Sequence, residues 1–215
     1  MEQLRGSAAQ LCIVTGTLTA LTSAIGRFVS DPSRLAETSD DPAAVINGVV
    51  ALIASLLLVF VLLALYGEHR EPRGGHRLGP VALKVALVGT ALLAGDFWFE
   101  AFVVPYLADV APAALGGDPG GALLVGAVSS FIVFAVGWLL FGIEGYRDGS
   151  LPRAPLILVT AAAVLGAPPG GLGKIVFGIA LVWLGLSIRR HSSPRLSRPS
   201  WKFEVAVPRL SPAWW

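Results

Sequence analysis

The chain has 215 residues, of which 54% are hydrophobic and only 14% are charged, and its mean hydropathy is +0.72. Soluble domains carry about 25% charged residues, so this composition excludes an ordinary soluble domain and indicates a membrane protein with several spans. The formal net charge is +2, and the single cysteine, Cys12, excludes a disulfide within the chain.

Six stretches are apolar enough to be candidate membrane spans, which need about 20 residues each. They lack the alternating polarity of barrel strands, so helices are expected. We predict an all-α integral membrane protein in which residues 1–190 form a bundle of six transmembrane helices. The six stretches are residues 6–28, 44–66, 79–106, 120–141, 155–167 and 171–188.

The fifth stretch is short and joins the sixth through the sequence GAPPGG. We expect a tight helical hairpin here. A single re-entrant element is the alternative, because Pro168 and Pro169 can lie at membrane depth only if protein buries them.

The charges of the connecting segments predict the orientation. Arginines gather in the second and fourth connections, whereas the first and third connections are acidic. Because Lys and Arg are retained on the cytoplasmic side, we predict that both termini face the cytoplasm. The residues concerned are Arg70, Arg73, Arg77, Arg147 and Arg153, against Asp31, Glu37, Asp40, Asp41, Asp109 and Asp118.

Residues 191–215 form a basic tail that contains tryptophan, serine and proline. Tryptophan prefers the membrane interface, and each basic residue near anionic lipid contributes about 1 kcal/mol. We therefore expect the tail to contact anionic lipid at the cytoplasmic face or a partner protein, with a solvated tail as the alternative. The candidate contact residues are Arg189, Arg190, Trp201, Trp214 and Trp215.

Four charged residues lie inside the predicted spans near their outer ends: Arg27, Asp96, Glu100 and Lys174. Asp96 and Glu100 are one helical turn apart. When Gly16-Thr17 is aligned with Gly89-Thr90, Arg27 falls at the depth of Glu100. Because unpaired charges in a membrane are costly, we predict one neutral cluster of four charges, with Arg27 and Glu100 paired.

This cluster has three interpretations. It is a structural clamp, a set of ordinary interface charges in which Arg27 and Lys174 reach water and Glu100 is hydrated, or a working site, in which the deeper Asp96 is the stronger candidate. The aromatic residues around it predict an outer aromatic belt, and Trp138 and Tyr146 predict an inner one. The outer set is Phe97, Trp98, Phe99, Phe102 and Tyr106.

Small residues recur along two of the predicted helices. Gly171, Gly178 and Gly185 repeat every seven residues, and Gly126 stands between Ala122 and Ser130. Such stripes let helices approach closely. They predict either packing within the monomer or a homo-oligomer interface.

No catalytic constellation stands out. GAPPGGLGKI departs from a phosphate-binding loop at Pro168 and Ile175, and no HExxH motif is present. We expect no cofactor, no metal site, no catalytic residue and no nucleic-acid partner. The first expectation for function is a non-enzymatic accessory or structural component of the plasma or inner membrane that acts through partner proteins or lipid. The alternative is a small transporter or proton-coupled carrier that uses Asp96, Glu100, Arg27 and Lys174.

Overall fold

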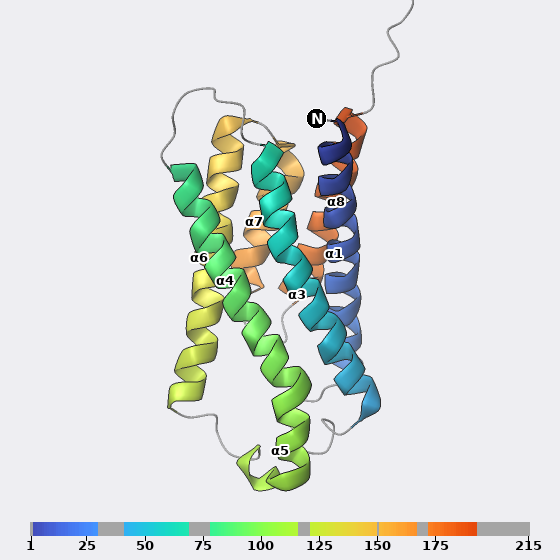
Figure 1. Cartoon of the computed structure of the whole chain (residues 1–215), viewed down its shortest axis with the longest axis vertical. Helices are drawn as coiled ribbons and strands as arrows, with labels where there is room; N and C mark the ends of the chain where they lie inside the picture. Colours follow the sequence, from blue (N-terminus) through green and yellow to red (C-terminus); the bar gives the residue numbers. More distant parts are fainter. Residues whose placement is uncertain are drawn as a thin grey trace, which may run out of the picture.

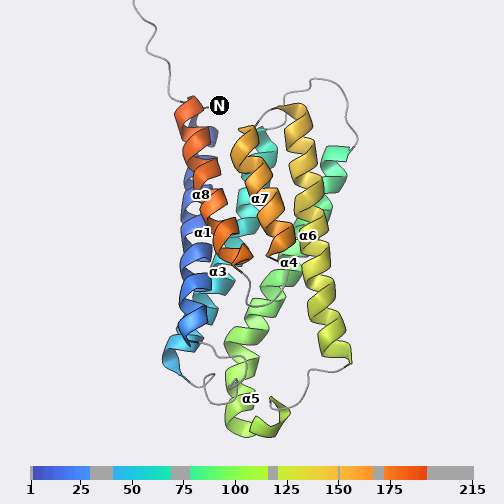
Figure 2. The ribbon, with the colours of Figure 1, turned by 180° about the vertical axis from the view of Figure 1, so that it is seen from behind.

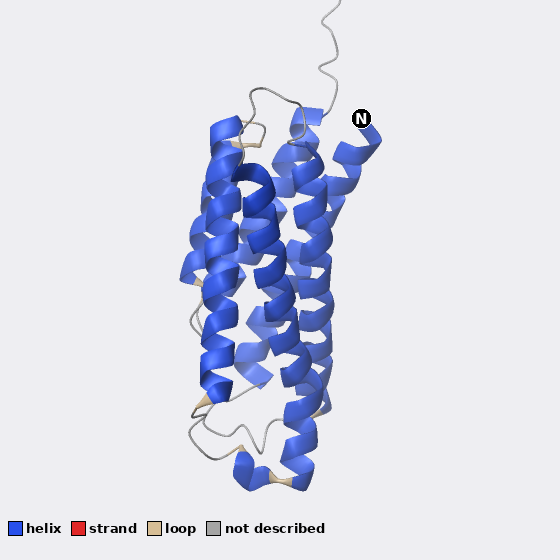
Figure 3. Cartoon of the chain, turned by 60° about the vertical axis from the view of Figure 1, so that its left-hand side comes forward, coloured by secondary structure: helices blue, strands red, loops and turns tan. Residues whose placement is uncertain are grey.

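The structure is a computed structural model that describes residues 2–29, 41–68, 78–115, 121–149, 151–166 and 172–192. All regular elements in these segments are helical, and they form six rods that run roughly along one axis (Figure 3). The predicted count of six helices is therefore confirmed. In chain order the elements are α1 (Glu2–Val29), α3 (Pro42–Glu68), α4 (Leu78–Trp98), η2 (Phe99–Val103), α5 (Val104–Val110), η3 (Pro112–Ala114), α6 (Ala122–Asp148), α7 (Arg153–Leu165) and α8 (Gly173–Ser192).

Four of the rods are long and apolar enough to cross a membrane: Gly6–Phe28, Pro42–Gly67, Gly79–Val110 and Ala122–Asp148. The third of these is continuous from α4 through η2 into α5. Each covers about 30 Å or more at 1.5 Å per residue, which matches the hydrocarbon core of a bilayer. The composition and the structure together indicate a membrane protein.

The other two rods are shorter. Helix α7 has 13 residues and α8 has 20, but the apolar part of α8 covers only residues 175–188, so each offers an apolar length of only about 20 Å. Figures 1 and 2 show that both end part-way along the bundle while the long helices continue. The predicted hairpin is thus present, and it reaches less far than the four long rods. Its connection, residues 167–171, lies outside the described residues.

Helices α1 and α8 lie side by side, with the beginning of α1 and the end of α8 at the same end of the bundle (Figure 1). A Cβ at Gly178 would lie 2.6 Å from the backbone nitrogen of Ala20, and one at Gly185 would lie 2.6 Å from the carbonyl oxygen of Ala9. The glycine stripe of α8 therefore packs within the monomer, against α1. Gly171 lies outside the described residues.

A second close pair is formed by α4 and α6. A Cβ at Gly89 would lie 2.5 Å from the backbone of Phe134, and one at Gly137 would lie 2.5 Å from the backbone of Ala86. Helix α3 contacts both α1 and α4 and so connects the two pairs. Gly126 differs from these glycines, because a Cβ there would meet no neighbouring atom within 4 Å.

Aromatic side chains fill the space between α6 and α8. Phe177 of α8 packs against Phe134 and Trp138 of α6, with ring centroids 5.8 and 5.1 Å apart. Trp138 is only 1% exposed and its Nε1 donates to Thr90 Oγ1 at 3.4 Å. The prediction that Trp138 belongs to an inner interface belt is therefore wrong, because its ring is a core residue that joins three helices.

The tail can be followed only at its beginning. Helix α8 continues to Ser192, two residues beyond the predicted end of the bundle domain, and Arg189 and Arg190 lie exposed in its last turn. Trp201, Trp214 and Trp215 lie outside the described residues, so the predicted contact of the tail with lipid or a partner stays a prediction.

Candidate charged site at the tip of the hairpin

Three of the four predicted charges come together where the hairpin ends. Asp96 is in the last turn of α4 and is half-buried, Glu100 is in η2 and is exposed, and Lys174 is the second residue of α8 and is half-buried. Lys174 Nζ lies 5.2 Å from the ring centroid of Phe97, which adjoins Asp96 in the chain, and Glu100 follows about one turn later. We call Asp96, Glu100 and Lys174 the tip cluster.

The ammonium group of Lys174 is held by aromatic faces. Its Nζ lies 5.2 Å from the ring centroid of Phe97 on α4 and 5.3 Å from that of Phe131 on α6. Both distances fall within the roughly 6 Å over which a cation is attracted to a ring face. Lys174 therefore connects the α1–α8 pair to the α4–α6 pair through its charge.

The carboxylate of Asp96 does not have a full set of hydrogen-bond partners in the structure. Ser130 Oγ approaches its Oδ1 at 3.5 Å, but the same hydroxyl lies 3.0 Å from the carbonyl oxygen of Gly126. A hydroxyl has one proton to donate, and the shorter contact is the better hydrogen bond. Asp96 Oδ2 is buried and has no hydrogen-bond partner in the structure. Such an oxygen is usually satisfied by a proton, a water molecule or a cation.

Glu100 lies in a turn of π-helix that the sequence explains. The N–H of Val104 donates to the carbonyl of Phe99, five residues earlier. Pro105, the second residue of α5, has no N–H to donate, and its ring crowds the preceding turn. The helix accommodates Pro105 by widening into this π turn. Such π turns are frequent at functional sites.

The fourth predicted charge, Arg27, lies near the end of α1, at the level of η2. A Cβ at Gly26 would lie 3.1 Å from Asn47 of α3, and a Cβ at Gly48 would lie 3.2 Å from the Cβ of Ala101 in η2. One layer of the bundle thus contains the end of α1, the beginning of α3 and η2. Helix α3 contacts both α1 and η2. The pairing of Arg27 with Glu100 stays a prediction.

Two members of this region do not follow from the sequence. The sequence pattern places Ser130 in a stripe of small residues, yet Ser130 is the residue of α6 that faces Asp96. Nothing in the pattern marks Phe131. The signal that could have found both is Lys174 itself, because a cation near the end of a short helix needs electron-rich neighbours on the helices beside it.

The predicted outer aromatic belt has only some of its members on the surface. Trp98, Phe102 and Tyr106 are 53%, 47% and 64% exposed, as side chains at an interface would be. Phe97 instead packs against the core and contributes a ring to Lys174. The structure therefore places Trp98, Phe102 and Tyr106 on the surface, Phe97 in the site and Phe99 partly buried.

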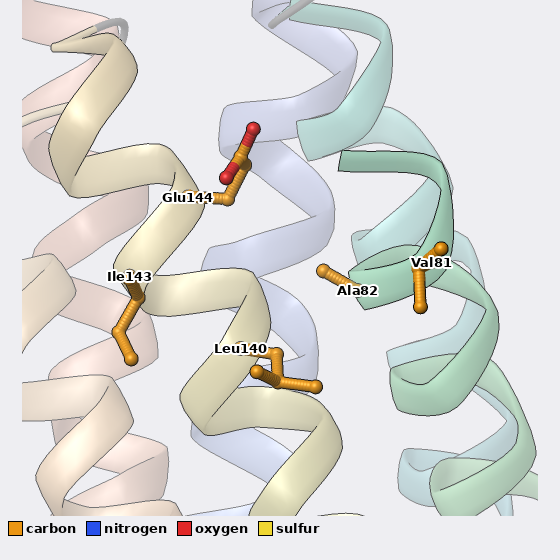
Figure 4. Close-up of a pocket in the computed structure, with 5 residues that line it drawn as sticks. All are labelled: Val81, Ala82, Leu140, Ile143 and Glu144. Atoms are coloured by element: carbon orange, nitrogen blue, oxygen red, sulfur yellow. The ribbon is translucent and has the colours of Figure 1, made fainter. Parts of the chain in front are cut away.

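A second buried carboxylate lies at the opposite end of the same helix pair. Glu144 of α6 is only 7% exposed and lines a small pocket with Val81, Ala82, Leu140 and Ile143. Figure 4 shows its side chain reaching from α6 toward α4, above Ala82 and Leu140. The α4–α6 pair thus has a carboxylate near each end, and the pocket itself is too small and apolar to hold a solute.

The comparisons with known proteins add no relative to this geometry: no protein-family model, curated protein or solved structure matches the chain. Among the described residues, no three histidine, cysteine, aspartate or glutamate side chains gather in a way that could hold a metal ion. The side chains of the tip cluster themselves offer two kinds of chemistry. The cluster can hold a cation against two rings, and it can accept a proton or a cation at Asp96.

Proposed function

We propose that this protein is a small carrier of the plasma or inner membrane that moves a charged solute through the tip cluster. The observation that carries the proposal is the position of Lys174, at the deep end of a hairpin that stops part-way along the bundle, with its Nζ over the ring of Phe97, the neighbour of Asp96 in the chain. Carriers commonly build their sites where helices break off inside the membrane.

The energetics of charge in a membrane support this proposal. A charged side chain at membrane depth costs several kcal/mol, so such residues are rare and commonly mark a pathway. In a purely structural clamp, we would expect the opposite charges to form ion pairs in direct contact. Here Asp96 keeps a buried oxygen without a partner, and Lys174 is held by rings. The cluster is thus poised for a further group.

The packing also supports relative motion of two units. Backbones are in close contact within the α1–α8 pair and within the α4–α6 pair, as the glycines show. Between α8 and α6 the contacts are made by large side chains, chiefly Phe177 against Phe134 and Trp138. Rocking one rigid pair against the other is a common way to alternate access to a central site.

In this proposal both termini face the cytoplasm and the tip cluster opens toward the outside. Four helices cross the membrane, and the α7–α8 hairpin enters from the cytoplasmic side without crossing it. The exposed Arg147, Arg153, Arg189 and Arg190 at the cytoplasmic end agree with the bias of basic residues toward that side.

The test is charge movement by purified protein reconstituted in liposomes on a solid-supported membrane. Gradients of protons, small amines, amino acids and carboxylates would be applied in turn. We expect a transient current for at least one gradient, abolished by Asp96→Asn and unchanged by Asp109→Asn, a matched change of an exposed carboxylate on α5. Wild-type protein that is silent under every gradient, or a current that survives Asp96→Asn, would overturn the proposal.

A second candidate function, an accessory subunit that docks on another membrane protein, is favoured by the outer turns of α6. Leu123, Leu124 and Val125 are consecutive and are 53%, 50% and 65% exposed, so none of the described elements covers α6 on any side there. Gly126, in the same turns, is open to close approach.

Membrane cross-linking tests this second candidate. A cysteine at position 126, in a background with Cys12→Ala, should form a disulfide with a second copy or with a labelled partner in native membrane. A cysteine at Leu139, which is exposed farther along α6, is the control. If both cysteines react only with lipid-soluble reagents and form no cross-link, the docking function is excluded.

A further inference from the structure

We infer that the rings of Phe97 and Phe131, together with Asp96 and Glu100, form a binding site for an alkylammonium group, and that Lys174 fills it in this conformation. The inference rests on the proposed carrier function and names its substrate class as organic amines. We call these four residues the ammonium cage.

Lys174, which occupies the ammonium cage, shows which chemical group the cage binds. The Nζ of Lys174 lies over two rings at nearly equal distances, 5.2 and 5.3 Å, from two different helices. Ring faces attract cations and have little affinity for anions, and two faces on one cation are the usual way to recognise an ammonium group. Asp96 adjoins Phe97 in the chain and Glu100 follows about one turn later, so their negative charges also favour a cation in this region.

The cage belongs to one rigid unit and its occupant to another. Phe97, Asp96 and Phe131 are fixed on the closely packed α4–α6 pair, whereas Lys174 stands on α8, which is packed against α1. A movement of α8 away from α6 would withdraw the lysine and leave the rings and carboxylates behind, while α7 stays packed on α6 at Gly142 and Thr160. An external amine can then take the same place.

The site also has capacity that Lys174 does not use. Among the described residues, Lys174 makes no ion pair with Asp96 or Glu100 at contact distance, and Asp96 Oδ2 is left without a donor. An ammonium group carries three donors. A free amine, unlike a tethered lysine, can shift toward Asp96 while it keeps contact with the rings.

Chemical rescue of Lys174→Ala tests the inference. The substitution removes three methylenes and the ammonium group, so n-propylammonium is the matching probe and 1-propanol is its uncharged counterpart. The thermal midpoint of the purified variant in detergent would be measured as each compound is titrated. We expect the midpoint to rise with propylammonium, in proportion to the logarithm of its concentration above the dissociation constant. We expect 1-propanol to have no such effect.

Two further variants make the result specific. Lys84→Ala removes the same side chain from an exposed position on α4, far from the cage, and should show no difference between the two compounds. Adding Asp96→Asn to Lys174→Ala should weaken the response to propylammonium. If Lys174→Ala unfolds on purification, the purification is repeated with propylammonium or 1-propanol in the buffer, and a higher yield of folded protein with propylammonium alone is the expected result.

The outcomes separate the inference from the carrier proposal. Equal responses to propylammonium and 1-propanol, or equal responses of the Lys174 and Lys84 variants, would overturn the ammonium cage even if the wild type carries another solute. A cation-specific response of the Lys174 variant supports the cage by binding alone, whether or not any current is measured.

Discussion

The indole ring of Trp138 and the ring of Phe177 meet edge to face, with centroids 5.1 Å apart and planes at 89°. This contact joins α6 to α8 about one helical turn from Lys174 along α8. Phe177 is 4% exposed, and replacing it with alanine should leave a cavity and cost about 3–5 kcal/mol of unfolding free energy. The measurement is reversible unfolding in mixed detergent micelles, with Phe102→Ala as the control.

Phe102 is a suitable control because it is 47% exposed on the surface of η2, so its loss creates no cavity. We expect that variant to stay within about 0.5 kcal/mol of the wild type. Equal losses in the two variants would mean that Phe177 does not anchor the hairpin.

The glycines of α8 and α6 should respond to alanine in opposite directions. At Gly178 a methyl group would lie 2.6 Å from the backbone of α1, so Gly178→Ala must push the two helices apart and should destabilise the protein by about 1–3 kcal/mol. At Gly126 a methyl group meets no atom within 4 Å, and alanine is the better helix former by up to about 1 kcal/mol. Thermal midpoints in detergent give the comparison, and the same sign of change at both sites would contradict it.

Much of the fold could be predicted from composition and pattern. Apolar runs of about 20 residues predict the four long helices, because backbone N–H and C=O groups in lipid must form their hydrogen bonds within a helix. The short fifth stretch and GAPPGG indicate a hairpin. How far the hairpin extends along the bundle could not be derived from the sequence. It depends on which side chains of α6 pack against Phe177, and that contact joins residues far apart in the chain.

The sequence predicts the two carboxylates and Lys174 of the site, but it does not predict the residues that surround them. Asp96, Glu100 and Lys174 stand out as charges within apolar spans. Ser130 and Phe131 do not, because a serine or phenylalanine in a membrane helix has many ordinary roles.

Trp138 shows the same limit of sequence patterns. Tryptophan favours membrane interfaces on average, because its N–H needs a polar partner. Here Thr90 supplies that hydrogen-bond partner inside the bundle, so the ring can be buried. The position of the partner depends on how α4 packs against α6, which no local pattern specifies.

Two double-mutant cycles should identify the cation that interacts with Glu100. The first combines Glu100→Gln with Lys174→Met, and the second combines Glu100→Gln with Arg27→Met. Because the charge of Lys174 acts on Glu100, which is itself exposed, we expect a coupling of up to about 1 kcal/mol in the first cycle and a smaller one in the second. A coupling well above about 1 kcal/mol with Arg27 would instead establish the pairing predicted by the depth alignment.

The orientation can be checked with two cysteines in a Cys12→Ala background. Ala113, in η3, and Asp148, at the end of α6, are both exposed and lie at opposite ends of the bundle. A membrane-impermeant maleimide added to intact cells should label a cysteine at position 113 and not one at position 148. Labelling of position 148 alone would place the termini outside and would turn the tip cluster toward the cytoplasm.

Asp96→Asn should separate function from stability. The contact from Ser130 to Asp96 is 3.5 Å long, and the same hydroxyl already has the carbonyl of Gly126 at 3.0 Å, so little hydrogen bonding is lost. An amide also removes a charge that has no contact partner at Oδ2. We therefore expect the unfolding free energy to change by less than about 1 kcal/mol while charge movement in liposomes disappears. Ser130→Ala is the control for local packing and should keep most of the current. If Asp96→Asn instead lowers stability by about 3 kcal/mol or more, as breaking a desolvated ion pair does, Asp96 and Lys174 act as a structural clamp and the carrier loses its central residue.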